Sequence, residues 1–416
     1  MKYYSLAVLC GVALILCLVV PASCAVTPLW TEAGAASSEL SGVAISADGS
    51  TIIAGGDQLI SLTPEGRERW AGWSGTSLAV SSDGDYILAS KGQDLRLISG
   101  AGALIWEKSM DITVTDLSMT PDASVIAAAG GGRIRIMKFS GEDIGTNATL
   151  AVNHIGIMPA GDRILITTNN NVQLSDFTLI PEWSDTSSAQ DLIAIAPDGS
   201  SFVTATANRV RMYNGTGKLI WDKKFASGNA EALAYSRDGS MIVIGTDDNH
   251  LQVLNRLGTV LWTATAGNWF SCVAVSNDGN IIAAGSLDKK LYVYNRAGTL
   301  LGTYGTQGPI KFNSVAITGD GSLIVVVNGL TVYGFSRSSF MPEETTGETI
   351  TGPIPETTVE TTTTLLPATT TRKVTTRIPT LPTPYPTTSE TPEEALPLAV
   401  PLTALLLLFL WRLRKT

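Results

Sequence analysis

Residues 233–262 read LAYSRDGSMIVIGTDDNHLQVLNRLGTVLW, and residues 78–106 follow the same plan as LAVSSDGDYILASKGQDLRLISGAGALIW. Both copies open on apolar residues, turn at an Asp-Gly pair and end at a tryptophan. An acidic residue marks the turn in each copy, at steps of roughly 35 to 42 residues, which is the length of a propeller blade. These markers are Asp48, Asp83, Asp122, Asp162, Asp198, Asp238, Asp278 and Asp320. The sequence therefore predicts eight repeats between Leu40 and Phe335.

Each copy divides into four short strands separated by turn residues. In the second copy the expected strands are Leu78–Val80, Tyr86–Ala89, Leu95–Ile98 and Leu104–Trp106. The Asp-Gly pair is expected to supply the positive φ of a two-residue hairpin, as such pairs commonly do. The pattern predicts an all-β unit of four antiparallel strands in every repeat.

A four-stranded sheet of this size cannot cover both of its own faces, so neighbouring sheets must stack, and radial stacking closes into a propeller. The last copy ends near Phe340 without a fourth strand, whereas residues 27–34 near the N-terminus offer one. In that segment Leu29-Trp30 matches the strand ending Leu261-Trp262. We therefore predict an eight-bladed β-propeller, over residues 26–340, in which the N-terminal strand becomes the outermost strand of the eighth blade and covers its edge.

The N-terminal 25 residues have the composition of a secretory signal. Met1-Lys2 precedes an apolar run from Leu6 to Val20, and small residues follow up to Ala25. We expect residues 1–25 to be removed on export. A second interpretation makes Cys24 a lipid-carrying first residue. The propeller then holds one cysteine, Cys272, so no internal disulfide is expected.

The repeat pattern stops after residue 340. Residues 341–395 are rich in Thr, Pro and Glu and are expected to form a disordered stalk, whose threonines suit O-glycosylation. Residues 396–411 are almost wholly apolar and predict a short C-terminal hydrophobic helix, and residues 412–416 form a basic tail on the cytoplasmic side. The apolar run is either a minimal membrane anchor or a sorting segment removed after export. The expected location is therefore the cell surface, with the propeller outside.

Two stretches resemble known propeller families. The segment AAGSLDKKLYVYN, residues 283–295, resembles the repeats of WD-type and YVTN-type propellers of the archaeal or bacterial cell surface. The segment YNGTGKLIW, residues 213–221, resembles the tryptophan motif of quinoprotein propellers. The resemblance implies the fold, but unrelated activities share that fold, so it implies no single function.

The composition excludes several function classes. The net charge is -9, and the basic residues are scattered singly, so no patch is expected to bind nucleic acid. The chain has two histidines, His154 and His250, and no cysteine pair, so neither a His/Cys metal site nor a haem attachment is expected. It has no serine elbow and no glycine-rich phosphate loop. We expect no catalytic residues, no metal and no cofactor.

The tryptophans fall into two groups. Those that recur at one position per repeat are expected to pack blade against blade: they are Trp30, Trp70, Trp106, Trp183, Trp221 and Trp262. Trp73 and Trp269 lie outside this register, in segments that link an outer strand to the next inner strand. Asn147 and Asn214 begin acceptor patterns for N-glycans.

In propellers the linking segments share one face with the second-hairpin turns, and we expect a ligand on that face. Its exposed aromatic and amide side chains would suit a carbohydrate or a protein. The candidate residues are Trp73, His154, Asn169, Asn170, Asn171, Asp247, His250, Trp269 and Phe270. The alternative is that Trp269 and Phe270 only plug the rim. The acidic turn Asp247-Asp248-Asn249 has the wrong spacing for a calcium loop and is expected to be a polar hairpin turn.

Two functions remain open from the sequence. The first is a non-catalytic surface module, a monomeric propeller that binds an envelope protein or glycan and acts in adhesion or as a scaffold. The second is an exported quinoprotein-like oxidoreductase or a polysaccharide-acting enzyme that uses the propeller centre. A central channel lined with small apolar residues would favour binding, whereas clustered acids or a ring of tryptophans would favour the enzyme.

Overall fold

The computed structural model describes residues 26–33, 38–147, 152–186, 192–225 and 228–340. The expected signal, stalk, hydrophobic helix and basic tail lie outside the described residues, as does the alternative at Cys24. Within the described ranges, no helix has the length and apolar character needed to cross a membrane.

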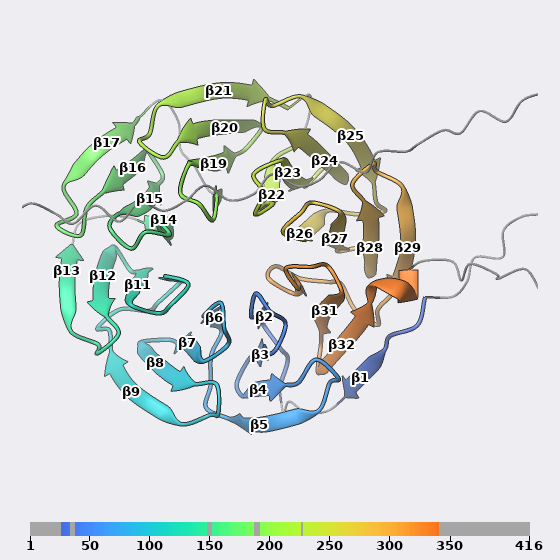
Figure 1. Ribbon diagram of the computed structural model, residues 1–416, viewed down its shortest axis with the longest axis horizontal. Helices are drawn as coiled ribbons and strands as arrows, with labels where there is room; N and C mark the ends of the chain where they lie inside the picture. Colours follow the sequence, from blue (N-terminus) through green and yellow to red (C-terminus); the bar gives the residue numbers. More distant parts are fainter. Residues whose placement is uncertain (1–25, 34–37, 148–151, 187–191, 226–227, 341–416) are drawn as a thin grey trace, which may run out of the picture. The chain divides into compact units, whose positions relative to one another are not determined.

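The described residues form eight antiparallel sheets of four strands each, arranged radially about an axis (Figure 1). In blades 1 to 7 the strands follow the chain from the innermost to the outermost position. Blades 1 to 4 consist of β2 (Gly42–Ile45), β3 (Ile52–Gly55), β4 (Leu59–Leu62), β5 (Glu68–Gly72); β6 (Ser77–Val80), β7 (Tyr86–Lys91), β8 (Asp94–Ser99), β9 (Leu104–Ser109); β10 (Asp116–Met119), β11 (Val125–Gly130), β12 (Arg133–Lys138), β13 (Asp143–Asn147); and β14 (Val152–Ile157), β15 (Ile164–Thr168), β16 (Val172–Ser175), β17 (Pro181–Asp185).

Blades 5 to 8 complete the ring, and a short 3-10 helix follows the last strand. They consist of β18 (Leu192–Ile195), β19 (Ser201–Thr206), β20 (Arg209–Asn214), β21 (Leu219–Lys224); β22 (Ala230–Tyr235), β23 (Met241–Thr246), β24 (His250–Asn255), β25 (Val260–Thr265); β26 (Phe270–Val275), β27 (Ile281–Ser286), β28 (Lys290–Asn295), β29 (Leu300–Gly305); and β30 (Val315–Ile317), β31 (Leu323–Asn328), β32 (Thr331–Ser336), β1 (Trp30–Ala33), with η1 (Arg337–Phe340). Each innermost strand contacts that of the next blade, and β30 contacts β2, which closes the ring.

The eighth blade joins the two ends of the described chain. β1 pairs antiparallel with β32, placing Trp30 opposite Gly334 and Thr31 opposite Tyr333. The predicted count of eight blades and the closure by the N-terminal strand are therefore confirmed. Without β1, the edge of β32 would present unpaired backbone groups to solvent.

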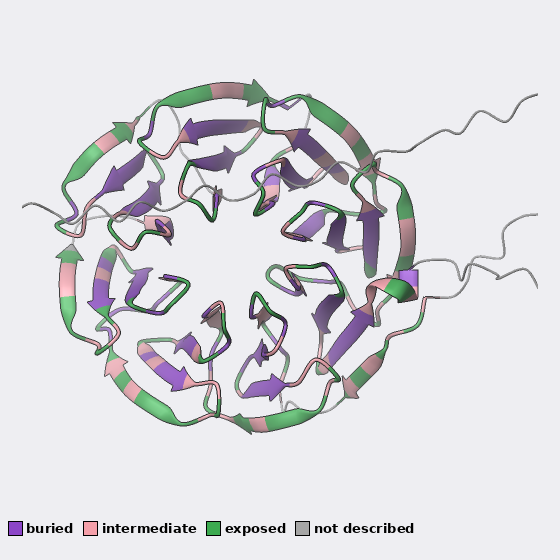
Figure 2. Ribbon diagram, in the orientation of Figure 1, coloured by how far each residue is buried: buried purple, intermediate pink, exposed green. Residues whose placement is uncertain are grey.

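The core lies between neighbouring blades. The second strand of a blade, such as β11 or β23, is buried along its whole length, whereas the outermost strand alternates between exposed and half-buried residues (Figure 2). In one such interface Ile134 and Ile136 of blade 3 pack with Ile155 and Ile164 of blade 4. Because each sheet buries its apolar face only against another sheet, no blade is complete by itself.

The Asp-Gly turns differ from the expected two-residue hairpin. In blade 2 the Ser81 amide donates to the Tyr86 carbonyl, so four residues stand in the loop. Only Gly84 has positive φ, at 74°, whereas the two-residue turn would need positive φ at Asp83 as well. The Asp83 carboxylate instead accepts from the Ser81 hydroxyl at 2.6 Å and from the Asp85 amide at 3.1 Å. The aspartate thus stabilises the turn by accepting hydrogen bonds.

Candidate functional site

The recurring tryptophans dock each blade onto the next. Trp262 of β25 donates from its indole Nε1 to the Arg296 carbonyl of blade 7, at 2.9 Å. A Cβ added to Gly298 in the same turn would lie 2.6 Å from the indole Cγ, so a glycine permits the contact. The equivalent hydrogen bonds are Trp30 to Pro64, Trp70 to Gly100, Trp106 to Phe139 and Trp221 to Arg256. Trp183 lies against Gly217 in the same manner.

These six tryptophans and the glycine turns they cover form what we call the tryptophan belt. The outermost strands of blades 3 and 7 lack the belt tryptophan, and each has a glycine at the equivalent position, Gly145 and Gly302. Gly145 of β13 lies opposite Ile136, and a Cβ there would lie 2.1 Å from the Phe177 carbonyl of the next blade. Gly302 of β29 leaves space for Val26 and for Phe340 of η1. At these positions the neighbouring segment fills the place of the indole.

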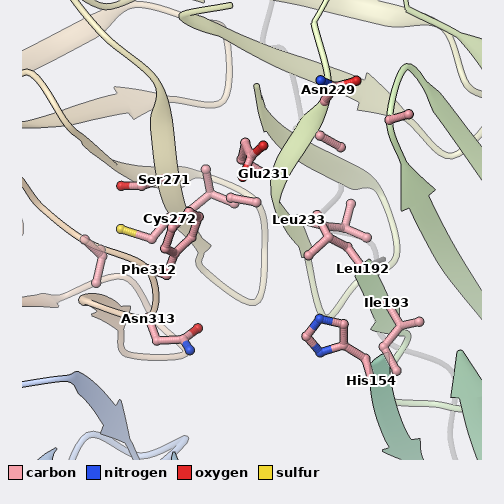
Figure 3. A pocket seen from close by; sticks show the side chains of 15 residues that line it. His154, Leu192, Ile193, Asn229, Glu231, Leu233, Ser271, Cys272, Phe312 and Asn313 are labelled. Atoms are coloured by element: carbon pink, nitrogen blue, oxygen red, sulfur yellow. The ribbon is translucent and has the colours of Figure 1, made fainter. Parts of the chain in front are cut away.

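The functional candidate is a cavity at the axis. It has a volume of about 790 Å³ and is lined by residues from blades 4 to 8 and the segments that lead into their inner strands (Figure 3). A smaller cavity of about 240 Å³ is lined mostly by blades 1 to 3, and Asn313 and Val315 line both. The larger one, which we call the axial cavity, is lined by His154, Leu192, Ile193, Ala207, Asn229, Ala230, Glu231, Ala232, Leu233, Ser271, Cys272, Val273, Phe312, Asn313 and Val315.

The polar lining of the axial cavity combines an acid, an imidazole and amides. His154 and Asn313 extend toward each other from opposite sides, and Glu231 lies on the side of Ser271 and Cys272 (Figure 3). The wall is neither a crowd of small apolar residues nor a ring of tryptophans, since no tryptophan lines either cavity. It is a mixed surface of the kind that orients a ligand with a few polar groups among apolar ones.

His154 is the predicted site residue that lines the axial cavity. Its Nδ1 lies 3.3 Å from Asp116 Oδ2, which belongs to blade 3 and lines the smaller cavity. The same oxygen accepts from the Ile155 amide at 2.7 Å, and Oδ1 accepts from the Leu117 amide at 3.0 Å. Asp116 therefore joins two blades at the inner wall, with the imidazole beside it.

The other polar candidates lie in turns. Asn171 accepts the Thr168 hydroxyl hydrogen bond through Oδ1 at 2.7 Å, and Asn169 and Asn170 are exposed in the β15–β16 turn. Asp247 accepts from the amide and the side chain of Asn229, both at 2.7 Å, so it supports a residue of the axial cavity without lining it. His250 Nδ1 lies 3.0 Å from Asp248 Oδ1, at the start of β24. The structure does not bring these residues together into one site.

The aromatic candidates divide between surface and core. Phe270 is fully buried against Tyr292, with ring centroids 5.5 Å apart, so it is unavailable to a ligand and the prediction of its exposure was wrong. Trp269 is 39% exposed. Trp73 is 40% exposed, and its indole donates to the Gly102 carbonyl of blade 2 at 3.1 Å, beside the belt residue Trp70. Trp73 thus extends the belt contact rather than the axial wall.

Sequence reasoning missed Asn229, Glu231, Phe312 and Asn313. The first two stand at the start of an inner strand, and the last two stand in the segment that leads into β30. Their position offered a signal, because these are the places where the first strand of a copy enters the ring.

Nucleophilic and metal chemistry have little support at the axis. Burial raises the pKa of the Cys272 thiol to about 11, so it stays protonated near neutral pH. Among the residues that the structure describes, no group of three or more His, Cys, Asp or Glu is placed to hold a metal ion.

The two glycosylation candidates lie at strand ends. Asn147 is the last residue of β13. Asn214 ends β20, where its Oδ1 accepts from the Thr216 amide, the Thr216 hydroxyl and the Lys218 amide at 2.8 to 3.0 Å. Glycosylation at either position stays a prediction.

Comparisons with known proteins agree with the fold. Residues 171–341 match the PQQ_2 family, described as outer membrane protein assembly factor BamB. A crystal structure of Chaetomium thermophilum Sqt1, bound to the N-terminus of ribosomal protein L10, is similar with a TM-score of 0.61 and 14% identity. The similarity covers 72% of this chain and 97% of that one, and at this identity it shows the fold alone. No curated protein sequence matches the chain.

Proposed function

From the premise that this chain is a WD- and quinoprotein-like β-propeller repeat protein, we propose that it is a non-catalytic binding or scaffold module whose axial cavity receives a partner. The partner is an envelope protein or glycan, and the propeller is displayed outside the cell. The observation that carries the proposal is the axial cavity itself, of about 790 Å³, with a mixed polar and apolar wall drawn from five blades.

The geometry supports binding because the wall is built on a rigid frame. The inner strands that carry it are held by cross-blade hydrogen bonds, such as the Val43 amide to the Asn313 carbonyl at 2.9 Å and the Ile157 amide to the Ser118 hydroxyl at 2.9 Å. Side chains on such a frame lose little conformational freedom when a ligand arrives. The preorganised wall therefore favours recognition.

The sequence outside the described residues supports display at the surface. An export signal at residues 1–25, a Thr/Pro stalk and an apolar segment at residues 396–411 would together hold a propeller away from a membrane. The parts play separate roles in the proposal, because the cavity accounts for binding and the flanking segments account for location.

Site-specific cross-linking tests the proposed function. Benzoylphenylalanine is placed in the full-length chain at position 312, on the axial cavity, or at Thr263, on the exposed side of β25. With isolated cell envelope, we expect a discrete cross-linked product from position 312 and none from position 263. Equal labelling from both positions would show that the cavity is not the binding surface.

A further inference from the structure

We infer that the axial cavity selects a cationic side chain, a lysine or arginine presented by an extended polypeptide. This inference rests on the proposed function and adds the chemical class of the partner. It combines three features of the wall: its charge, its one exposed phenyl ring and its apolar sides.

The ionisable side chains that line the two cavities include two carboxylates and one imidazole, His154, whose Nδ1 lies 3.3 Å from Asp116 Oδ2. Glu231 lines the axial cavity and Asp116 lines the smaller cavity beside it, whereas neither cavity is lined by a lysine or an arginine. The net charge of the chain is -9, so the field of the whole molecule does not reverse this local sign. A carboxylate recessed in a cavity attracts a cation more strongly than one at a flat surface, because less water screens it.

Phe312 supplies the second feature. The residue is 48% exposed and lines the cavity, so part of it is open to a ligand. A cation placed over the face of an aromatic ring is attracted by the ring quadrupole. The neighbouring Asn313 amide adds a carbonyl oxygen that can accept from an ammonium or a guanidinium.

The apolar sides account for the stem of such a residue. Leu192, Ile193 and Leu233 line the side of the cavity opposite Phe312 (Figure 3). Lysine and arginine bury their methylene groups along apolar surface while the charged end reaches a polar partner. The volume of about 790 Å³ exceeds one side chain, so it also admits the adjoining backbone of a polypeptide.

An anionic ligand fits the wall poorly, because no lysine or arginine lines it and the one imidazole, His154, lies with its Nδ1 3.3 Å from Asp116 Oδ2. A glycan would need flat aromatic platforms, and Phe312 is the single phenyl or indole ring among the lining residues. A basic polypeptide is therefore the partner that the wall favours.

The test uses the full-length protein and two capped seven-residue Gly/Ser peptides, one with a central lysine and one with a central glutamine, titrated by calorimetry. We expect the lysine peptide to bind at least about tenfold more tightly, since charge-assisted hydrogen bonds and cation–π contacts each add to affinity. Glu231→Gln should reduce that preference to within about twofold, and Phe312→Leu should weaken the lysine peptide by about threefold to tenfold. Thermal melts of each variant check that the propeller stays folded.

Glu68→Gln is the matched control, because it removes one negative charge on the exposed outermost strand β5, away from the lining residues. Its lysine-peptide affinity should equal that of the native protein. Equal weakening by Glu68→Gln and Glu231→Gln would overturn the inference, because net charge alone would then explain binding. If both peptides bound equally and Phe312→Leu weakened both alike, the preference for a cation would be wrong. The cavity would still be the binding surface. The proposed function itself would fail in a different experiment, if benzoylphenylalanine at position 312 gave no cross-linked product with cell envelope.

Discussion

The tryptophan belt and the axial cavity are built from the same blades in opposite ways. In the belt, side chains repeat: an indole from one blade meets a glycine turn of the next at six of the eight junctions. At the axis, the backbone repeats but the side chains are less uniform. His154 stands where blade 3 has Asp116, and Phe312 aligns with Phe270 of blade 7, which is buried and does not line the cavity. Residues that hold the ring together therefore recur with the same contact, whereas residues that face the cavity differ between blades in identity or in exposure.

The reason for this difference is physical. Every junction between blades must solve the same packing problem, so one solution serves throughout the ring. A ligand meets the axis once, and its recognition needs different groups at different points around it. Changes in the belt should thus alter stability, and changes in the cavity wall should alter binding.

Removal of the closing strand should have the largest effect. Deletion of residues 26–33 leaves the edge of β32 unpaired and removes Trp30, whose indole donates to the Pro64 carbonyl at 2.8 Å. We expect loss of a cooperative thermal transition and aggregation by size-exclusion chromatography. A synthetic peptide of residues 26–33 should restore part of the transition. A deletion variant that melts within about 2 °C of the native protein would contradict closure by β1.

Truncation of one belt tryptophan should have the second-largest effect on stability. Trp262→Ala removes the hydrogen bond to the Arg296 carbonyl and leaves a void against Gly298, and we expect a loss of about 2 to 4 kcal/mol in urea unfolding. Trp269→Ala is the control, since that side chain is 39% exposed and outside the belt, and it should cost less than about 1 kcal/mol. Similar costs for both variants would remove the distinction between belt and surface.

The glycine turns should be sensitive where an indole covers them. At Gly298, φ is 85° and an added Cβ would lie 2.6 Å from Trp262, so Gly298→Ala should cost about 1 to 3 kcal/mol. Gly92, in the turn between β7 and β8, also has positive φ, at 61°, but has nothing within 4 Å of an added Cβ. Gly92→Ala should therefore cost less than Gly298→Ala, and an equal loss would show that the positive φ, not the indole, decides.

The turn aspartates should contribute a smaller, pH-dependent term. The Ser81 hydroxyl and the Asp85 amide lower the pKa of Asp83 below its usual value, with burial opposing slightly. Because the folded pKa is the lower one, this stabilisation is present above the unfolded pKa of about 3.9 and is lost as pH falls through the folded pKa. Asp83→Asn should cost less than about 1.5 kcal/mol at pH 7 and nothing at low pH. Asp85→Asn is the control, and a pH-independent cost of Asp83→Asn would contradict the charged hydrogen bond.

The cavity wall should affect stability least. Phe312→Leu changes a side chain that is 48% exposed, so we expect a loss below about 1 kcal/mol. Phe335→Leu changes a fully buried ring in blade 8 and should cost more than about 1 kcal/mol, as shape changes in a packed core do. If Phe312→Leu proved as costly as Phe335→Leu, Phe312 would belong to the core rather than to a binding wall.

The sequence alone determined the ring. Repeats with an acidic turn, a glycine turn and a terminal tryptophan fix the number of blades, and the unmatched Leu29-Trp30 predicts the closure, because these signals are local and each recurs. The sequence did not predict the length of the turn around Asp83, because the same Asp-Gly pair occurs in loops of different lengths.

The site was decided only by the tertiary structure. His154 was identified because its segment lies on the face expected to bind a ligand, whereas Glu231, Phe312 and Asn313 are ordinary residues until the ring brings blades 4 to 8 around one axis. Phe270, one residue from the exposed Trp269, is buried because its strand begins there and turns alternate side chains to opposite faces. A linear pattern records which residues repeat, but convergence on an axis depends on the closed ring, in which residues more than a hundred positions apart become neighbours.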